Sequence, residues 1–329
     1  MPEAVSNILQ VPQHEATVLS VVCPMHNEAE CLNAFFIRLL AALKELKISF
    51  EIVCINDGSD DSTLQGLYGW RALDSRIRVI DLSRNFGKEA ALTCGIDYAT
   101  GEAVVPIDAD LQDPPELIGE MVKVWRQGFD VVLAQRIDRA TDGFLKRKTA
   151  TWFYRLHNAI SDFPLPSNVG DFRLMDRKVI SALAKLPERR RFMKGLFAWV
   201  GFRQATIPYR RERRNAGQTK FSGWRLWNFA IEGITSFSTA PLRIWTYLGS
   251  TIALIAFSYG LLLSASVLLF GRDMPGYASL MTVILFLGGV QLIGLGILGE
   301  YLGRLYGEAK GRPVYLIREE DSNASQYLP

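Results

Sequence analysis

The chain has 329 residues, enough for one large domain or two ordinary ones, and 49% of them are hydrophobic, with a mean hydropathy of +0.09. Its 37 basic and 34 acidic residues leave a formal net charge of +3. No recognised nucleic-acid-binding motif accompanies the basic residues, so we expect no nucleic acid partner.

Residues 1–16 form an expected N-terminal tail. They include Glu3 and Glu15 but no lysine or arginine, and therefore lack the basic start of a signal peptide. The chain's cysteines fit no metal-binding spacing, which indicates reduced, buried thiols at Cys23, Cys31, Cys54 and Cys94.

Short apolar runs alternate with helix-like stretches between residues 18 and 134. The runs predict strands at Val18–Cys23, Phe50–Ile55, Arg78–Leu82, Ala103–Ile107 and Val131–Ala134. The stretches predict helices at Glu28–Leu46, Ser62–Ala72, Lys88–Tyr98 and Pro115–Arg126. The first helix has one apolar face, made by Leu32, Phe35, Phe36, Leu39, Leu40 and Leu43. This alternation predicts an α/β fold with a mostly parallel sheet, covered on both faces, and a ligand at the carboxyl ends of the strands.

Acidic residues crowd together just after the fourth predicted strand, in the stretch PIDADLQDPPE (residues 106–116). Like charges at this spacing repel unless a cation lies among them. Alternate residues of an extended chain point to one side, so Asp108, Asp110 and Gln112 are expected to converge on one ion. Oxygen ligands without a nearby cysteine or histidine indicate Mg²⁺ or Mn²⁺. The alternative is an acidic surface loop.

Polar residues also follow the first two strands, in PMHNE (24–28) and NDGSDDST (56–63). No GxGxxG follows the first strand and no GxxxxGK[ST] occurs, so a nucleotide would have to be held by acids and amides. Carboxylates such as Glu28 and Asp57 accept hydrogen bonds from ribose hydroxyls or a base imide. The other interpretation of Asp57-Gly58-Ser59 is a turn followed by a helix cap.

Two uncharged runs near the C-terminus, residues 244–270 and 274–299, each exceed the roughly 20 residues that cross a bilayer. The short linker between them predicts a membrane hairpin rather than two core helices, which would carry a polar face. Lysine and arginine are abundant on both sides of the hairpin and nearly missing from its turn, so both termini are expected in the cytoplasm. Ten basic and two acidic residues lie between Glu188 and Lys220. This basic segment has two possible interpretations, a solvated surface or a surface that contacts anionic lipid headgroups.

Taken together, the motifs VCPMHNE, INDGSDDST, SRNFGKEAAL, DADLQDPPE and GDFRLMDR resemble glycosyltransferase family 2 in its polyisoprenyl-phosphate branch. The resemblance continues through RRERRNAGQTKFS, EGITSFSTAPLR and GEYLGRLYGEAKGRPVY, and thus covers nearly the whole chain. The undecaprenyl-phosphate (bactoprenol) glucosyltransferases are nearest in layout. One departure is Asn56, because many relatives carry an acid before the position of Asp57.

The resemblance implies a GT-A fold, Rossmann-like, and a set of site residues. It places the metal on Asp108, Asp110 and Gln112, and catalytic roles on Asp110 and Asp171. Donor-binding residues would be Pro24, Glu28, Asp57, Lys88, Asp108, Arg211, Arg214 and Lys220. Arg136 and Arg147 are candidates for the acceptor phosphate. Asp171 matches the position of a proposed base, but a phosphate acceptor is already an anion near neutral pH, so positioning is an equal alternative.

The implied reaction is the inverting, metal-dependent transfer of a hexose, with glucose from UDP-glucose favoured, to undecaprenyl phosphate at the cytoplasmic face of a bacterial plasma membrane. GDP-mannose and a UDP-aminoarabinose type of donor are alternatives. A processive polysaccharide synthase is disfavoured because the QxxRW motif is missing. A non-catalytic membrane protein that binds a nucleotide sugar is the alternative outside the class of enzymes.

We therefore expect a catalytic domain at 17–222, a juxtamembrane amphipathic segment at 223–243, membrane helices at 244–270 and 277–301, and a cytoplasmic tail at 302–329. Gly299, Gly303 and Gly307 have GxxxG spacing, which is compatible with a homo-oligomer.

Overall fold

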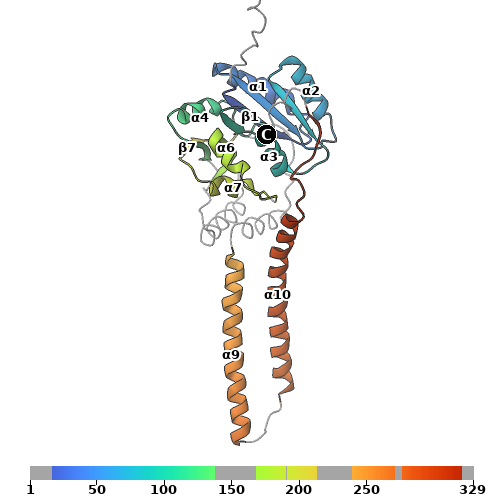
Figure 1. The fold of residues 1–329 in the computed structure, drawn as a ribbon, viewed down its shortest axis with the longest axis vertical. Helices are drawn as coiled ribbons and strands as arrows, with labels where there is room; N and C mark the ends of the chain where they lie inside the picture. The colour runs from blue at the N-terminus through green and yellow to red at the C-terminus, as the bar shows by residue number, and fades with distance from the viewer. Residues whose placement is uncertain (1–16, 138–167, 190, 213–238, 271–275, 321–329) are drawn as a thin grey trace, which may run out of the picture. The chain divides into compact units, whose positions relative to one another are not determined.

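The computed structural model describes residues 17–137, 168–189, 191–212, 239–270 and 276–320 (Figure 1). The described residues divide into two compact units. One consists of the residues before 213 together with those after 312, and the other contains the two long C-terminal helices. Each unit is described by itself.

The first unit is built on an eight-stranded sheet with the order β7-β5-β6-β4-β1-β2-β3-β8. Its strands are β1 (Leu19–Met25), β2 (Phe50–Asn56), β3 (Ile77–Leu82), β4 (Ala103–Pro106), β5 (Val131–Arg136), β6 (Val169–Asp176), β7 (Gln204–Tyr209) and β8 (Ile317–Glu320). The pairs β1–β2, β1–β4, β2–β3 and β5–β7 are parallel, whereas β6 and β8 pair antiparallel with their neighbours. The strand order reverses direction at β1 and β4, which is where an open α/β sheet binds its ligand.

Helices cover both faces of this sheet. Helices α1 (Leu32–Glu45), α2 (Thr63–Leu73) and α4 (Leu117–Trp125) share one hydrophobic core with β1 and β2. Helices α3 (Lys88–Tyr98), α6 (Arg177–Ala184) and α7 (Met193–Trp199) lie on the other face. Helix α3 packs closely because Gly95 has no side chain: a Cβ atom there would lie 2.2 Å from Cγ1 of Val22.

The predicted α/β class and the mostly parallel, doubly covered sheet are confirmed, and each of the five apolar runs forms a strand. The first helix begins at Leu32 rather than Glu28. Residues 28–31 turn instead, because the amides of Glu28 and Ala29 donate to the side chains of Thr63 and Asp61. All four cysteines are free and buried, as predicted.

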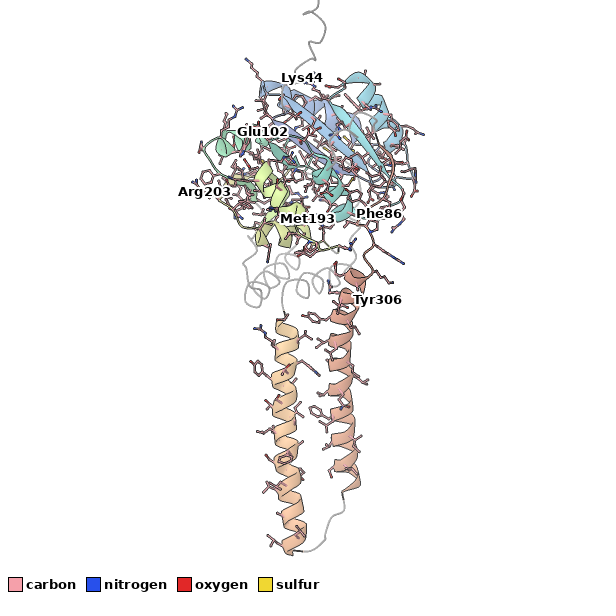
Figure 2. All side chains as sticks on the ribbon, viewed as in Figure 1. Lys44, Phe86, Glu102, Met193, Arg203 and Tyr306 are labelled. Carbon is pink, nitrogen blue, oxygen red and sulfur yellow. The ribbon has the colours of Figure 1, made fainter. Side chains whose placement is uncertain are left out.

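The second unit contains α9 (Ala240–Phe270) and α10 (Tyr277–Ala309), and in the view of Figure 2 the side chains drawn on each helix project to both sides of it. Within them, Leu242–Leu262 and Thr282–Ala309 are long and apolar enough to cross a bilayer, and their most apolar stretches are 0% and 6% buried. Helices of a soluble core would be covered. The two helices meet where Trp245 lies against Gly294.

The C-terminal segment differs from the expected tail. Helix α10 continues past residue 301 to Ala309, where Glu300 and Arg304 pair at 3.0 Å one turn apart. Strand β8 then pairs antiparallel with β3, Asp81 facing Glu319. Pairing covers an otherwise open sheet edge, which carries unsatisfied backbone groups.

Candidate active site

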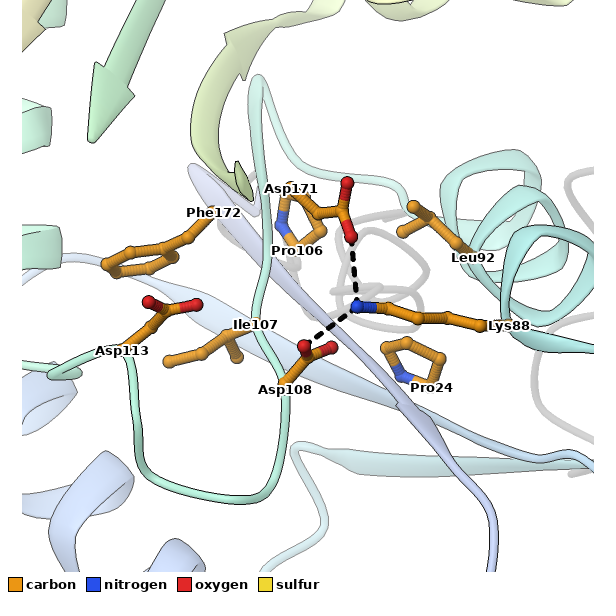
Figure 3. Close-up of a pocket in the computed structure, with 9 residues that line it drawn as sticks. All are labelled: Pro24, Lys88, Leu92, Pro106, Ile107, Asp108, Asp113, Asp171 and Phe172. Carbon is orange, nitrogen blue, oxygen red and sulfur yellow. Dashed lines mark hydrogen bonds and ion pairs between the residues drawn. The ribbon is translucent and has the colours of Figure 1, made fainter. Parts of the chain in front are cut away.

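A pocket opens at the carboxyl ends of β1 and β4, at the point where the strand order reverses (Figure 3). It is lined by Pro24, Lys88, Leu92, Pro106, Ile107, Asp108, Asp113, Asp171 and Phe172. Four of the residues singled out from the sequence, Pro24, Lys88, Asp108 and Asp171, are therefore brought together by β1, α3, β4 and β6.

Lys88 joins two of these carboxylates. Its Nζ atom lies 2.7 Å from Oδ2 of Asp108 and 2.9 Å from Oδ2 of Asp171 (Figure 3). Burial disfavours the ammonium, but the charges of the two carboxylates outweigh it and raise the pKa of Lys88. The positive charge that contacts Asp108 in this structure is thus the ammonium of Lys88, at the start of α3.

Asp171 and Arg173 lie two residues apart on β6. Burial opposes ionisation of Asp171, yet the charges of Lys88 and Lys194 hold the pKa of Asp171 well below its usual range. Burial lowers the pKa of Arg173 to about 10, and its guanidinium lies 4.3 Å from the centre of the Phe197 ring. Within the described residues, Oδ1 of Asp171 and Nε of Arg173 are buried without a hydrogen-bond partner.

The acidic stretch after β4 is a turn, not an extended chain, so the alternation argument for its metal site does not apply. Leu111 has a φ of +56°, which reverses the backbone between Asp110 and Gln112. Oδ1 of Asp110, a 6% exposed residue, accepts a hydrogen bond from the Gln112 amide at 3.1 Å. No group of three His, Cys, Asp or Glu side chains gathers at metal-binding distances within the described ranges.

Asp113 follows in the same turn and is 4% exposed. It accepts a short hydrogen bond from the Tyr209 hydroxyl, and Nη2 of Arg136 lies 4.0 Å away. Burial raises the pKa of Asp113 despite these partners. Arg136, a candidate for the acceptor phosphate, therefore lies beside the pocket and donates to the Tyr209 hydroxyl through Nε at 3.1 Å.

Asp57, at the end of β2, is turned toward the backbone. Its two carboxylate oxygens accept hydrogen bonds from the amides of Phe86 and Gly87 at 2.7 and 2.9 Å. Gly58 follows with a φ of +58°, and a Cβ there would lie 2.4 Å from the Asn85 amide. The chain does bend at Gly58, but the helix-cap part of the alternative interpretation is wrong, because α2 begins at Thr63 and its N-cap Ser62 makes no side-chain cap hydrogen bond. Asp57 also orders the loop that precedes Lys88.

The remaining candidates lie further along the chain. The amide of Glu28 donates to Thr63 at 2.9 Å, close to the end of β1. Nε of Arg211 is buried without a partner in the described part of the chain. Outside the described residues lie Arg147, Arg214, Lys220 and positions 223–238 of the juxtamembrane segment predicted at 223–243. The remainder of that segment runs into α9.

Sequence reasoning missed several groups around the pocket. Glu89, next to Lys88, accepts from the Met193 amide at 3.2 Å, and burial together with the nearby charge of Asp171 raises its pKa to about 7. Asp113, Arg173 and Tyr209 were also not singled out. The hydrogen bonds of Tyr209 with Arg136 and Asp113 join positions 73 and 96 residues apart, so only the fold reveals them. Arg173 lies two residues after Asp171 on β6, and its burial is likewise a property of the fold.

Comparison with known families identifies the class of protein to which the chain belongs. The chain belongs to glycosyltransferase family 2: the family model for "Glycosyl transferase family 2" matches residues 20–184. It is accordingly a glycosyltransferase with a GT-A-like sheet. A second model, "GtrB C-terminal hairpin", matches residues 240–305 and, with the two apolar helices, indicates association with a membrane.

Similar proteins extend over almost the whole chain. A bactoprenol glucosyl transferase of Shigella phage SfV is 52% identical and covers 92% of this chain and 98% of its own length. An uncharacterized glycosyltransferase of Synechocystis is 55% identical over 94% of this chain and 97% of its own. A mannosyltransferase of Pyrobaculum calidifontis, solved with GDP-Man and Mn²⁺, covers 88% of this chain and 85% of its own, with a TM-score of 0.42 and 16% identity.

Proposed function

We propose that this protein transfers glucose from UDP-glucose to undecaprenyl phosphate at the cytoplasmic face of a membrane. The observation that carries the proposal is the 52% identity to a bactoprenol glucosyl transferase over 92% of the chain. The pocket supports it chemically, because carboxylates and cations meet at the carboxyl ends of the strands.

The donor atoms in the turn after β4 support a divalent cation, although the described residues contain no ready-made group of three His, Cys, Asp or Glu side chains. Asp108 and Asp110 are hard oxygen donors in one short turn, and Asp108 already contacts the ammonium of Lys88. We infer that Asp108 and Asp110, with Gln112, hold Mg²⁺ or Mn²⁺ when the nucleotide sugar binds. The bound ion would neutralise charge on the departing diphosphate.

The chemical step in this proposal is a single displacement with inversion. A phosphate oxygen of the acceptor forms a bond to C1 of the sugar from the face opposite the leaving group. The bond between C1 and the diphosphate oxygen breaks, and its electron pair stays on the nucleoside diphosphate. Lys88, held beside Asp108, supplies fixed positive charge near the oxygens that gain this charge.

Asp171 is proposed to position a substrate group rather than to remove a proton. Its depressed pKa makes it a weak base, and the acceptor phosphate, with a second pKa of about 6, arrives mostly as a dianion at neutral pH. Oδ2 is bound to Lys88, whereas the buried Oδ1 has no partner among the described residues. That oxygen is available to accept a hydrogen bond from a sugar hydroxyl.

The test is a donor panel. Purified full-length protein is given undecaprenyl phosphate with UDP-glucose, other UDP-sugars or GDP-mannose, each with Mg²⁺, with Mn²⁺ or with a chelator. We expect a glucosyl lipid from UDP-glucose, loss of the product with chelator, and a β-linked product from the α-linked donor. Transfer from GDP-mannose alone would replace the donor assignment, and absence of any transfer would favour a nucleotide-sugar-binding protein.

The membrane orientation is a separate proposal. Basic residues flank both sides of the hairpin, so tags at both termini should be protected in intact cells and accessible after permeabilisation. Labelling of the C-terminus from outside intact cells would contradict a cytoplasmic catalytic unit.

A further inference from the structure

One arginine of β8, Arg318, connects the C-terminal segment to the loop that precedes Lys88. Nη1 of Arg318 donates to Oδ2 of Asp81 at 3.3 Å, and its Nη2 donates to the carbonyl of Ser83 at 2.7 Å. The backbone adds a contact beside it, from the Ser83 amide to the Leu316 carbonyl at 2.8 Å. Arg318 thus holds the start of the loop at residues 83–87.

The buried partner of Arg318 also joins β3 to β2. Asp81 is 1% exposed, and its Oδ1 accepts a hydrogen bond from Nδ2 of Asn56 at 2.7 Å. Asn56 immediately precedes Asp57, whose carboxylate holds the amides of Phe86 and Gly87. Consequently the end of β2 and both ends of the 83–87 loop belong to one hydrogen-bonded network.

The loop leads directly into the pocket. Lys88 follows Gly87 as the first residue of α3 and places its ammonium between two pocket carboxylates. We infer that Arg318 is a positioning residue for Lys88, so that the segment after the membrane hairpin takes part in the transfer reaction. This inference rests on the proposed function for its catalytic effect, but not for its structural effect.

Burial explains why this contact matters although it lies at a sheet edge. The side chain of Arg318 is 58% exposed, whereas that of Asp81 is 2% exposed. An exposed ion pair contributes little, but removing the donor to a buried carboxylate leaves that carboxylate short of a partner. The loop start would then loosen, and a small displacement of a reacting group is enough to slow a positioned reaction.

The experiment compares full-length wild type with Arg318→Ala and Arg318→Lys. Glu319→Gln is the matched control, since it changes the next residue of β8, whose side chain accepts a hydrogen bond from the Tyr68 hydroxyl at 3.5 Å. Hydrogen exchange of the peptide that contains residues 83–88 is measured without substrate, and peptides of β1 and β4 serve as internal references. Turnover and donor KM are measured with UDP-glucose and undecaprenyl phosphate.

For Arg318→Ala we expect exchange in 83–88 to rise about tenfold, with β1 and β4 unchanged. Turnover should fall about tenfold with donor KM within about twofold, because the defect concerns placement in the bound complex. Arg318→Lys, which keeps the charge but reaches one acceptor at a time, should lie between Ala and wild type.

Unchanged exchange in 83–88, an equal rise in β1 and β4, or an equal effect of Glu319→Gln would overturn the inference. If Arg318→Ala does not fold, Arg318→Lys decides the same question with an expected effect of about threefold. A protein that transfers no sugar leaves the exchange comparison intact, so failure of the proposed function is separable from failure of the positioning role.

Discussion

The buried charged groups at the two ends of the central sheet differ in how completely they are hydrogen-bonded. At the amino end, Glu51 of β2 accepts hydrogen bonds from the hydroxyls of Ser20 and Thr100, from the Thr100 amide, and from Arg78. At the carboxyl end, within the described residues, Asp171 and Arg173 each keep a buried polar atom without a partner. Buried polar atoms normally have hydrogen-bond partners inside the chain. Buried polar atoms that lack one therefore indicate the end of the sheet where a ligand supplies the missing hydrogen bonds.

The same contrast appears in the pKa values of two glutamates, the buried Glu51 and the half-buried Glu89. Burial raises the pKa of Glu51, but its hydrogen bonds outweigh burial, and the net shift is downward. For Glu89 at the pocket, burial and the charge of Asp171 act together, and the pKa rises to about 7. One acid therefore stabilises the fold as an anion, whereas ionisation of the other destabilises it.

The largest effect is expected at the carboxyl end. Asp110→Asn removes a charged oxygen ligand beside the leaving diphosphate and should lower transfer about a hundredfold, roughly 3 kcal/mol. Binding of Mn²⁺ should weaken in parallel, as measured by titration with the purified protein. Asp74→Asn, a change at the end of α2, is the control and should retain wild-type activity. Normal turnover of Asp110→Asn would remove the metal assignment.

A smaller effect of another kind is expected at the amino end. Glu51→Gln should lower stability by about 2 kcal/mol, because a buried pair with Arg78 is broken, while turnover per folded molecule stays unchanged. The folded pKa of Glu51 lies below the unfolded value of 4.5, so its stabilisation is present above that pH and is lost as the pH falls. Thermal unfolding at neutral and acid pH measures the difference. A turnover defect as large as that of Asp110→Asn would erase the contrast between the two ends.

A further effect, on stability alone and with the opposite sign, is expected from Glu89. Its folded pKa of about 7 exceeds the unfolded value of 4.5, so the contribution of Glu89 is fully present below pH 4.5 and is lost as the pH rises to about 7. Glu89→Gln should remove this slope in unfolding experiments across the window, and an unchanged slope would show that another group titrates.

Much of the fold could be anticipated from the sequence, but this contrast and the geometry of the pocket could not. Strands β1 to β5 were predictable because five apolar runs and their intervening helices are local patterns. Strand β8 has the sequence IREE and depends on pairing with β3, so its short polar sequence carries no strand signal. Likewise, the acidic stretch after β4 was expected to be extended, because the sequence contains no signal that Leu111 adopts a left-handed backbone conformation, with a φ of +56°.

The pocket residues show the same limit. Lys88, Asp108 and Asp171 were singled out by resemblance, yet their contact joins α3, the turn after β4 and β6. Composition and spacing predict which groups are available, whereas the partner of each charge is decided by tertiary packing. For that reason Asp57 was expected to face the nucleoside, and its bonds to the amides of residues 86 and 87 were not foreseen.

The most direct test of the role of Asp171 at the pocket is a pH profile of transfer to a short-chain polyprenyl phosphate. It is measured with saturating donor for wild type and Asp171→Asn. If Asp171 positions a substrate group, the variant should be slower at every pH, and both proteins should keep the limb near pH 6 that reports the acceptor phosphate, whose second pKa is about 6. If Asp171→Asn lost that limb and a small exogenous base restored its activity, Asp171 would be a general base, contrary to the positioning role.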